Sequence, residues 1–137
     1  MASNFYADEY DMRVLLINHE FPPDGGGGGW STLQLASALG RLGHKVSVLT
    51  SIGTDKCSDV GNNTMIYKVG PRRRFRYRFS IFGMVTFLLA ALLWILRKGG
   101  SRYDVAVSFF SFPAGVVGYV LKKRWGVPYI VSLRGAD

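Results

Sequence analysis

Five consecutive glycines, Gly25–Gly29, are the residues of this sequence with the clearest chemical potential. They stand between an apolar run that ends at Asn18 and an amphipathic segment that contains Leu33 and Leu39. A helix that begins with glycines presents backbone N–H groups with no side chains over them, and the helix dipole adds partial positive charge there. Such a turn is suited to binding anions, phosphates above all. The alternatives are a permissive turn and, for Gly29, close packing of a helix on a strand.

The two familiar phosphate-binding loops do not fit these glycines. The Walker A pattern requires lysine directly after its last glycine, whereas Trp30 stands there. The dinucleotide pattern G-x-G-x-x-G matches at Gly25 and Gly27 but has Trp30 in place of its third glycine. The second apolar run also ends in Thr50 rather than in the acid that would bind a ribose. The sequence therefore disfavours a nicotinamide enzyme and a Walker-type nucleotide hydrolase.

Two further polar residues, His19 and Glu20, directly follow the first apolar run. A single histidine is usually a structural group, although it can serve as a ligand. Glu20 can either orient a substrate hydroxyl or face water, and the sequence does not separate these roles. His44 lies in a helix-to-strand turn and is interpreted as structural. The sequence has one cysteine, Cys57, and no cluster of metal-ligating residues, so no metal and no cofactor are expected.

The elements that position these residues alternate between strands and helices. Short apolar runs predict five strands, at residues 13–18, 45–50, 65–69, 104–110 and 128–133. Apolar periodicity predicts a helix after the glycines that ends at Gly43, and further helices over residues 79–96 and 113–126. This alternation predicts an α/β fold, a Rossmann-like three-layer domain with a mainly parallel sheet. The carboxyl ends of its strands are expected to converge on one ligand-binding rim.

The length of the chain limits the number of domains, and its charge indicates the kind of partner. The 137 residues suit one domain, and the formal net charge of +8 favours a polyanionic partner. Residues 1–11 are expected to be a disordered polar lead-in, and residues 12–137 a folded domain. The first residues do not have the pattern of a signal peptide, so a cytoplasmic location is expected.

A block of basic and aromatic residues precedes an uncharged apolar helix at residues 79–96. The helix has about the minimum length for a membrane span, but a span would put the strands on either side of it across a membrane. A buried or interfacial helix is therefore preferred, with the protein peripheral on the cytoplasmic face of a membrane. RNA binding is a weaker alternative, because no base-reading module is visible. The predicted membrane contacts are Arg72, Arg73, Arg74, Phe75, Arg76 and Arg78.

The stretch MRVLLINHEFPPDGGGGGWSTLQLASALGRLGHKVSVLTS resembles the opening of the N-terminal domain of the family-four-like retaining glycosyltransferases, which have the GT-B fold. The matching features are Phe21 with two prolines and Asp24, the glycine pair Gly26 and Gly27, and a turn of Gly43, His44 and Val46. The later segments YDVAVSFFSFPAG and GVPYIVSLRGAD resemble the fourth and fifth strands of that family. The resemblance thus extends over most of the chain from Met12 onward.

The resemblance implies half of a GT-B fold and transfer of a glycosyl unit from a nucleotide sugar to an acceptor, either lipid-linked or a polysaccharide. It also implies a C-terminal donor-binding domain that this sequence does not contain, so the chain alone is expected to be inactive. The alternative is a non-catalytic domain that binds an anionic membrane or a partner. No catalytic residue is assigned, and nucleic acid is not an expected partner. The residues expected to line the rim for the donor diphosphate and the acceptor are Gly26, Gly27, Gly29, Ser111, Arg134 and Asp137.

Overall fold

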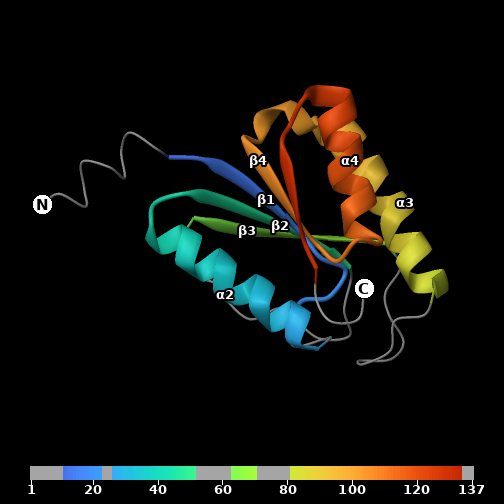
Figure 1. The fold of residues 1–137 in the computed structure, drawn as a ribbon, viewed down its shortest axis with the longest axis horizontal. Coiled ribbons are helices and arrows are strands. Elements are labelled where there is room, and N and C mark those ends of the chain that lie inside the picture. Colours follow the sequence, from blue (N-terminus) through green and yellow to red (C-terminus); the bar gives the residue numbers. More distant parts are fainter. Residues whose placement is uncertain (1–10, 23–25, 52–62, 71–80, 134–137) are drawn as a thin grey trace, which may run out of the picture.

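All five predicted strands are present and form one parallel sheet in the order β3-β2-β1-β4-β5 (Figure 1). The structure is a computed structural model that describes residues 11–22, 26–51, 63–70 and 81–133. The observed strand ends differ from the predicted ones by single residues. The strands are β1 (Arg13–Ile17), β2 (Lys45–Ser51), β3 (Thr64–Val69), β4 (Val105–Phe109) and β5 (Tyr129–Ser132).

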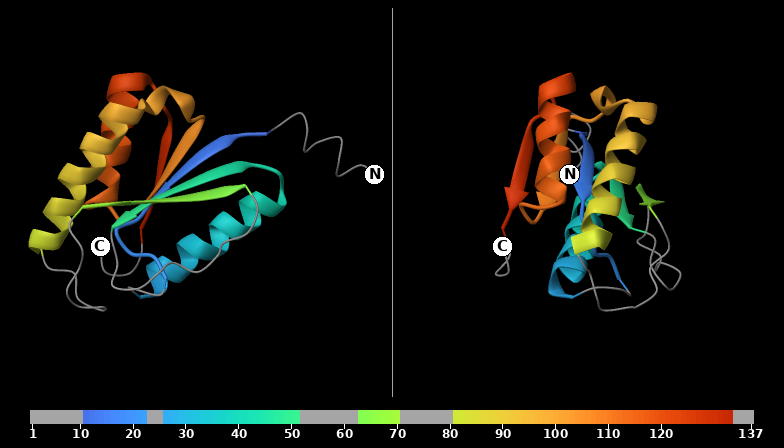
Figure 2. Two further views of the ribbon diagram at one scale, coloured as in Figure 1. Left: turned by 180° about the vertical axis from the view of Figure 1, so that it is seen from behind. Right: turned by 90° about the vertical axis from the view of Figure 1, so that its right-hand side faces the viewer.

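Helices cover both faces of this sheet, which confirms the predicted three-layer α/β architecture (Figure 2). Helix α2 (Gly27–Arg41) packs on one face, and α3 (Ile81–Lys98) and α4 (Ala114–Trp125) pack on the other. A short 3₁₀ turn, η1 (Gly100–Arg102), precedes β4. Crossovers between parallel strands are right-handed, so helices change face where the strand order changes direction. That change occurs between β1 and β4, at the centre of the sheet.

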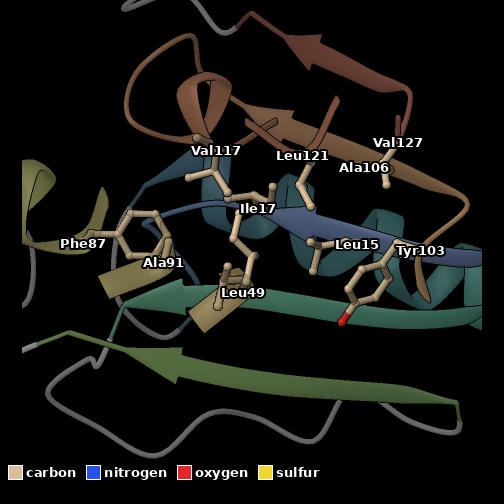
Figure 3. Packing of buried hydrophobic residues seen from close by; sticks show 12 residues of the cluster. Leu15, Ile17, Leu49, Phe87, Ala91, Tyr103, Ala106, Val117, Leu121 and Val127 are labelled. Carbon is tan, nitrogen blue, oxygen red and sulfur yellow. The ribbon is translucent and has the colours of Figure 1, made fainter. Parts of the chain in front are cut away.

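The sheet is buried on both faces because the side chains of its central strands alternate between two apolar clusters. Leu15 and Ile17 of β1 pack with Phe87 of α3 and Leu121 of α4 (Figure 3). The intervening β1 side chains, Val14 and Leu16, pack on the other face, where Ala36 of α2 is also buried. Successive side chains of a strand point to opposite faces of the sheet, and here both faces are apolar. The sequence of β1 is therefore a continuous apolar run.

Helix α2 begins within the glycine run, whereas the sequence predicted a helix that follows the glycines. The helix begins at Gly27, with Gly26 as its N-cap, so three glycines form its first turn. Gly26 has no side-chain cap, which leaves the first amides to other partners. The other end agrees with the prediction, because Gly43 has a φ of 93° directly after the C-cap Leu42. His44 has the structural role predicted for it: its Nδ1 accepts a hydrogen bond from the Met12 N–H at 3.1 Å.

Helix α3 lies against the sheet with only one side buried. Phe87, Ala91 and Ile95 face the core, and 17% of the helix is buried. Its length and mean hydropathy of 1.8 are those of a membrane-crossing helix. However, β3 before it and β4 after it belong to the same sheet, which a spanning course does not allow. The helix is therefore a surface helix with an apolar outer side and not a buried one, and its contact with a membrane stays a prediction.

Candidate functional site

The carboxyl ends of β1 and β4 lie side by side at the point where the strand order changes direction. Ligands of open α/β sheets bind at such a switch point, outside the carboxyl ends of the strands. The chain places three segments there: residues 18–20 after β1, the first turn of α2, and Phe110 with Ser111 after β4. The structure thus brings the glycines and the fourth-strand segment together at one rim, as the sequence predicted.

Asn18 connects β1 to α2 through a fully buried side chain. Its side-chain amide donates hydrogen bonds to Thr32 Oγ1 at 2.8 Å and to the Gly28 carbonyl oxygen at 3.1 Å. Its side-chain oxygen accepts a hydrogen bond from the Glu20 N–H at 3.0 Å. Asn18 was not among the predicted site residues. The available signal was an amide side chain directly after a buried strand, which must find hydrogen-bond partners.

The first glycines of α2 differ sharply in the space around them. A Cβ placed on Gly26 or Gly27 would meet no atom within 4 Å, whereas one on Gly28 would lie 2.6 Å from Cζ of Phe110. Gly29 is buried against the sheet, as its packing interpretation suggested. Gly26 and Gly27 are therefore open to an approaching ligand, and Gly28 is the glycine that close packing requires. Gly28 was not among the predicted site residues.

Glu20 supplies the carboxylate at this rim within the described part of the chain. Its Oε2 accepts a hydrogen bond from the Gly26 N–H at 3.3 Å. A carboxylate near a helix N-terminus is favourable because the helix dipole places partial positive charge there. The position on the Gly26 amide that suits an anion is thus held by a side chain of the protein itself. An anionic ligand on this amide has to displace Glu20.

His19 is packed between aromatic rings rather than open to a ligand. Its side chain is 3% exposed, and its ring centroid lies 5.5 Å from that of Phe110 and 6.3 Å from that of Phe87. Its carbonyl oxygen accepts a hydrogen bond from Ser51 Oγ at 2.7 Å. These contacts support the structural interpretation of His19.

Phe110 has an unusual backbone at the end of β4. Its φ is 74°, in the left-handed region that few residues other than glycine adopt. Its N–H donates to the Ser132 carbonyl oxygen at 3.0 Å, which links it to β5. Backbone strain of this kind concentrates at binding sites. The next residue, Ser111, is exposed and carries a hydroxyl at the rim.

Several predicted residues cannot be placed. Arg134 and Asp137 lie outside the described residues, as does the block of predicted membrane contacts, Arg72, Arg73, Arg74, Phe75, Arg76 and Arg78. Their roles stay predictions. Over residues 11–22, 26–51, 63–70 and 81–133, no three His, Cys, Asp or Glu side chains are grouped to hold a metal ion.

The arrangement can bind an anion and orient a hydroxyl. The amides of Gly26 and Gly27 at a helix N-terminus can provide the anion contact once Glu20 leaves the Gly26 N–H, and the Glu20 carboxylate can then accept a hydrogen bond from a hydroxyl group. Ser111, in the segment after β4, adds a second polar group. The site is thus suited to a phosphorylated ligand next to a polyhydroxylated one.

Comparison with solved structures shows the same fold in otherwise different proteins. The C-terminal domain of a hydrogenase from Pyrococcus furiosus is similar with a TM-score of 0.58 and 15% identity, over 89% of this chain and 92% of that domain. A second crystal structure of that domain gives a TM-score of 0.58 and 13% identity. MurG of Acinetobacter baumannii is similar over 89% of this chain and 34% of the MurG chain, with 19% identity and a TM-score of 0.48.

Comparison with sequence families identifies the family of this chain. No curated protein matches this chain. The model of the glycosyl transferase 4-like domain, however, matches residues 26–137, which include α2, the whole of β2–β5 and the segment after β4. This match covers well over half of the chain, and it starts at the glycine that caps α2. The chain therefore belongs to the family of glycosyl transferase 4-like domains.

Proposed function

We propose that this chain is the acceptor-side half of a retaining glycosyltransferase, which transfers a glycosyl unit from a nucleotide sugar to an acceptor at the rim between β1 and β4. The observation that carries the proposal is the pair of backbone amides of Gly26 and Gly27, which begin α2 with open space where a side chain would stand, at the switch point of a glycosyl transferase 4-like domain. Binding of the donor diphosphate at these amides follows from the preference of helix N-termini for phosphate.

Glycosyl transfer requires groups that stabilise negative charge, and the Gly26 and Gly27 amides are suited to that role. The diphosphate leaving group gains negative charge as the glycosidic bond breaks, and preorganised N–H donors stabilise that charge. In the proposed complex a phosphate oxygen replaces Glu20 on the Gly26 N–H. The released Glu20 carboxylate then accepts a hydrogen bond from an acceptor hydroxyl. Arg134 and Asp137 are proposed to contact a phosphate or the acceptor and a sugar hydroxyl, respectively.

The proposed enzyme includes a second Rossmann-like domain, outside this sequence, that binds most of the nucleotide sugar. No residue of the present chain is assigned as the catalytic acid, base or nucleophile. The purified chain alone is accordingly expected to give no transfer above a buffer control with any nucleotide sugar. Addition of the donor domain as a separate chain would restore transfer if the two halves dock.

A peripheral membrane contact is the second part of the proposal, and the outer side of α3 supports it. Six large apolar side chains are exposed along this helix at spacings that place them on its outer side. Arg97 and Lys98 follow them, and the arginine block precedes them in sequence. Basic residues next to an apolar surface suit an anionic leaflet on the cytoplasmic side, and a lipid-linked acceptor would be available there. The six residues, called here the outer face of α3, are Ile81, Phe82, Val85, Leu89, Leu93 and Leu96.

The proposed function is tested by Gly27→Val in the complete enzyme. Valine finds open space in the fold but covers the amide that the donor diphosphate approaches. Transfer is expected to fall at least ~10-fold while the melting temperature changes little, since a displacement of about 1 Å at a reacting group can cost ~100-fold in rate. Gln34→Val, at an exposed position of the same helix, is the matched control. Full activity of Gly27→Val would contradict the proposal.

A further inference from the structure

A pocket lies at the edge of the sheet opposite the rim. It has a volume of about 400 Å³ and is lined at the amino ends of three strands, β1, β2 and β3, together with η1 and the residue after it. Its volume falls within the usual range for small-molecule sites. Among its lining residues are Arg13, Lys45, Ser47, Tyr67, Arg102 and Tyr103.

Three cations surround this pocket. Arg13 and Lys45 are directly paired in the β1–β2 register, so their side chains emerge next to each other on the same face of the sheet. Arg102 approaches from η1, with its guanidinium carbon 5.3 Å from the centroid of the Tyr103 ring. Like charges in paired positions of a sheet are unfavourable unless something compensates them.

The neighbouring acid does not compensate these charges. Asp104 Oδ2 accepts a hydrogen bond from the Arg13 backbone N–H at 2.7 Å, and it makes no ion pair with the three cations in the described structure. All three cationic side chains are exposed and available to a ligand. The pocket is therefore complementary to an anion.

Tyr103 provides an unused hydrogen-bonding group at the floor of the pocket. The residue is 7% exposed, and its hydroxyl oxygen is buried with no hydrogen-bond partner. The Tyr103 ring lies beside Leu15 with its oxygen directed toward β2 (Figure 3). A buried hydroxyl without a partner costs free energy, and such groups in folded proteins call for a specific explanation. A bound phosphate oxygen, or a water that it carries, can accept this hydrogen bond.

Part of the pocket wall is apolar and aromatic. Tyr67 lines the pocket, and its ring centroid lies 5.0 Å from that of Trp94. Met65, on the β3 side, is 60% exposed. The Arg102 guanidinium also lies over Trp94, at 5.8 Å from the ring centroid. A ligand with a flat apolar group next to its anionic group would contact both kinds of surface.

We propose that this pocket binds a small organic phosphate that carries a planar or apolar group. Arg13, Lys45 and Arg102 hold the phosphate, the Tyr103 hydroxyl donates to it directly or through water, and Tyr67 with Met65 contacts the apolar group. The pocket lies at the amino edge of the sheet, whereas the rim lies at the carboxyl edge. Binding here is therefore independent of the proposed glycosyl transfer, and each can fail without the other.

The test uses the full chain and two probes, phenyl phosphate and inorganic phosphate, in isothermal titration calorimetry. Phenyl phosphate is expected to bind several-fold more tightly than inorganic phosphate, because only the ester contacts the aromatic walls. The double variant Arg13→Gln with Lys45→Gln is expected to weaken phenyl phosphate binding at least ~10-fold, since each charged hydrogen bond contributes strongly. The matched control, Arg41→Gln with Arg124→Gln, removes two exposed cations from the last turns of α2 and α4 that do not line the pocket, and it is expected to leave binding unchanged.

Tyr103→Phe separates a binding role from a structural one. Loss of an unpartnered buried hydroxyl should leave the melting temperature unchanged or raise it, while phenyl phosphate binding weakens about fivefold. The proposal is overturned by equal binding of the two probes, or by equal weakening in the control. It is also overturned if Tyr103→Phe binds phenyl phosphate as tightly as the wild type does. Binding of the wild-type chain to acidic lipid vesicles, with no binding to phenyl phosphate, overturns it as well. Circular dichroism of each variant confirms that the fold is intact.

Discussion

The side-chain amide of Asn18 lies 2.8 Å from Thr32 Oγ1 and donates a hydrogen bond to it. Both side chains are fully buried, and Thr32 Oγ1 in turn donates to the Gly28 carbonyl oxygen at 2.9 Å. This pair joins the end of β1 to the first turns of α2, which begin with Gly27. The position of the glycine turn over the sheet therefore depends on two buried polar side chains.

Asn18→Leu should destabilise the protein by about 1–3 kcal/mol, because it leaves the buried Thr32 hydroxyl and the Gly28 carbonyl without the amide donor. Equilibrium unfolding in urea measures this loss. Gln34→Ala, at an exposed position of α2, serves as the control and should change stability by no more than about 0.5 kcal/mol. Equal stability of Asn18→Leu and the wild type would show that the pair does not hold the turn.

Gly28→Ala and Gly27→Ala should change stability in opposite directions. In a helix, alanine is more favourable than glycine by about 1 kcal/mol. A Cβ on Gly27 enters open space, so Gly27→Ala should stabilise the protein. A Cβ on Gly28 would lie 2.6 Å from the Phe110 ring, which must move, and overpacking of this kind costs about 1–3 kcal/mol. Thermal melting of the two variants side by side provides the measurement. A more stable Gly28→Ala than Gly27→Ala would contradict the close packing described above.

Glu20→Gln should lower stability modestly, by up to about 1 kcal/mol, because a neutral amide interacts less favourably with the amino end of α2. Because Glu20 is half-buried, added salt should reduce the difference in stability between the variant and the wild type. Urea unfolding at low and high ionic strength measures both effects. Asp104→Asn at the opposite edge gives a comparison in which the charge is also removed but α2 is not involved.

The sequence predicted the architecture well because its signals are local. The continuous apolar runs of β1 and β4 and the left-handed glycine at Gly43 depend on neighbours in sequence, and each appears where expected. The handedness of parallel crossovers fixes which face of the sheet each connecting helix covers, whereas the strand order was not predicted. The start of α2 was placed less well, because a run of glycines has little intrinsic preference and the helix extends into it through packing on the sheet.

The candidate site was predicted only in part, because its remaining members depend on contacts between distant segments. Asn18 acquires its role from Thr32, and Gly28 acquires its role from Phe110, which follows β4 in the sequence. Such pairs cannot be read from spacing along one segment. The pocket beside Tyr103 was missed for the same reason, since its cations come from the beginnings of separate strands and from η1.

The outer face of α3 gives the prediction that best separates a membrane-associated domain from a soluble one. Leu89→Gln with Leu93→Gln should reduce co-sedimentation with acidic lipid vesicles several-fold, because it removes apolar side chains that would enter the interface. Both residues are exposed, so the fold and the melting temperature should be preserved. Leu42→Gln is the matched control, because Leu42 and Leu89 are each 62% exposed but Leu42 caps α2 at a different part of the molecule.

The arginine block should contribute the electrostatic part of the same binding. Replacement of Arg72, Arg73, Arg74, Arg76 and Arg78 by glutamine should release the protein from acidic vesicles. Salt should have a similar effect, because the screening length falls from about 10 Å at 0.1 M to about 3 Å at 1 M. The apolar variant should retain this salt dependence, whereas the glutamine variant should lose it. Equal binding to neutral and acidic vesicles would contradict the electrostatic contribution of the arginine block. Binding that Leu42→Gln weakens as much as the α3 variant does would show that α3 is not the docking surface.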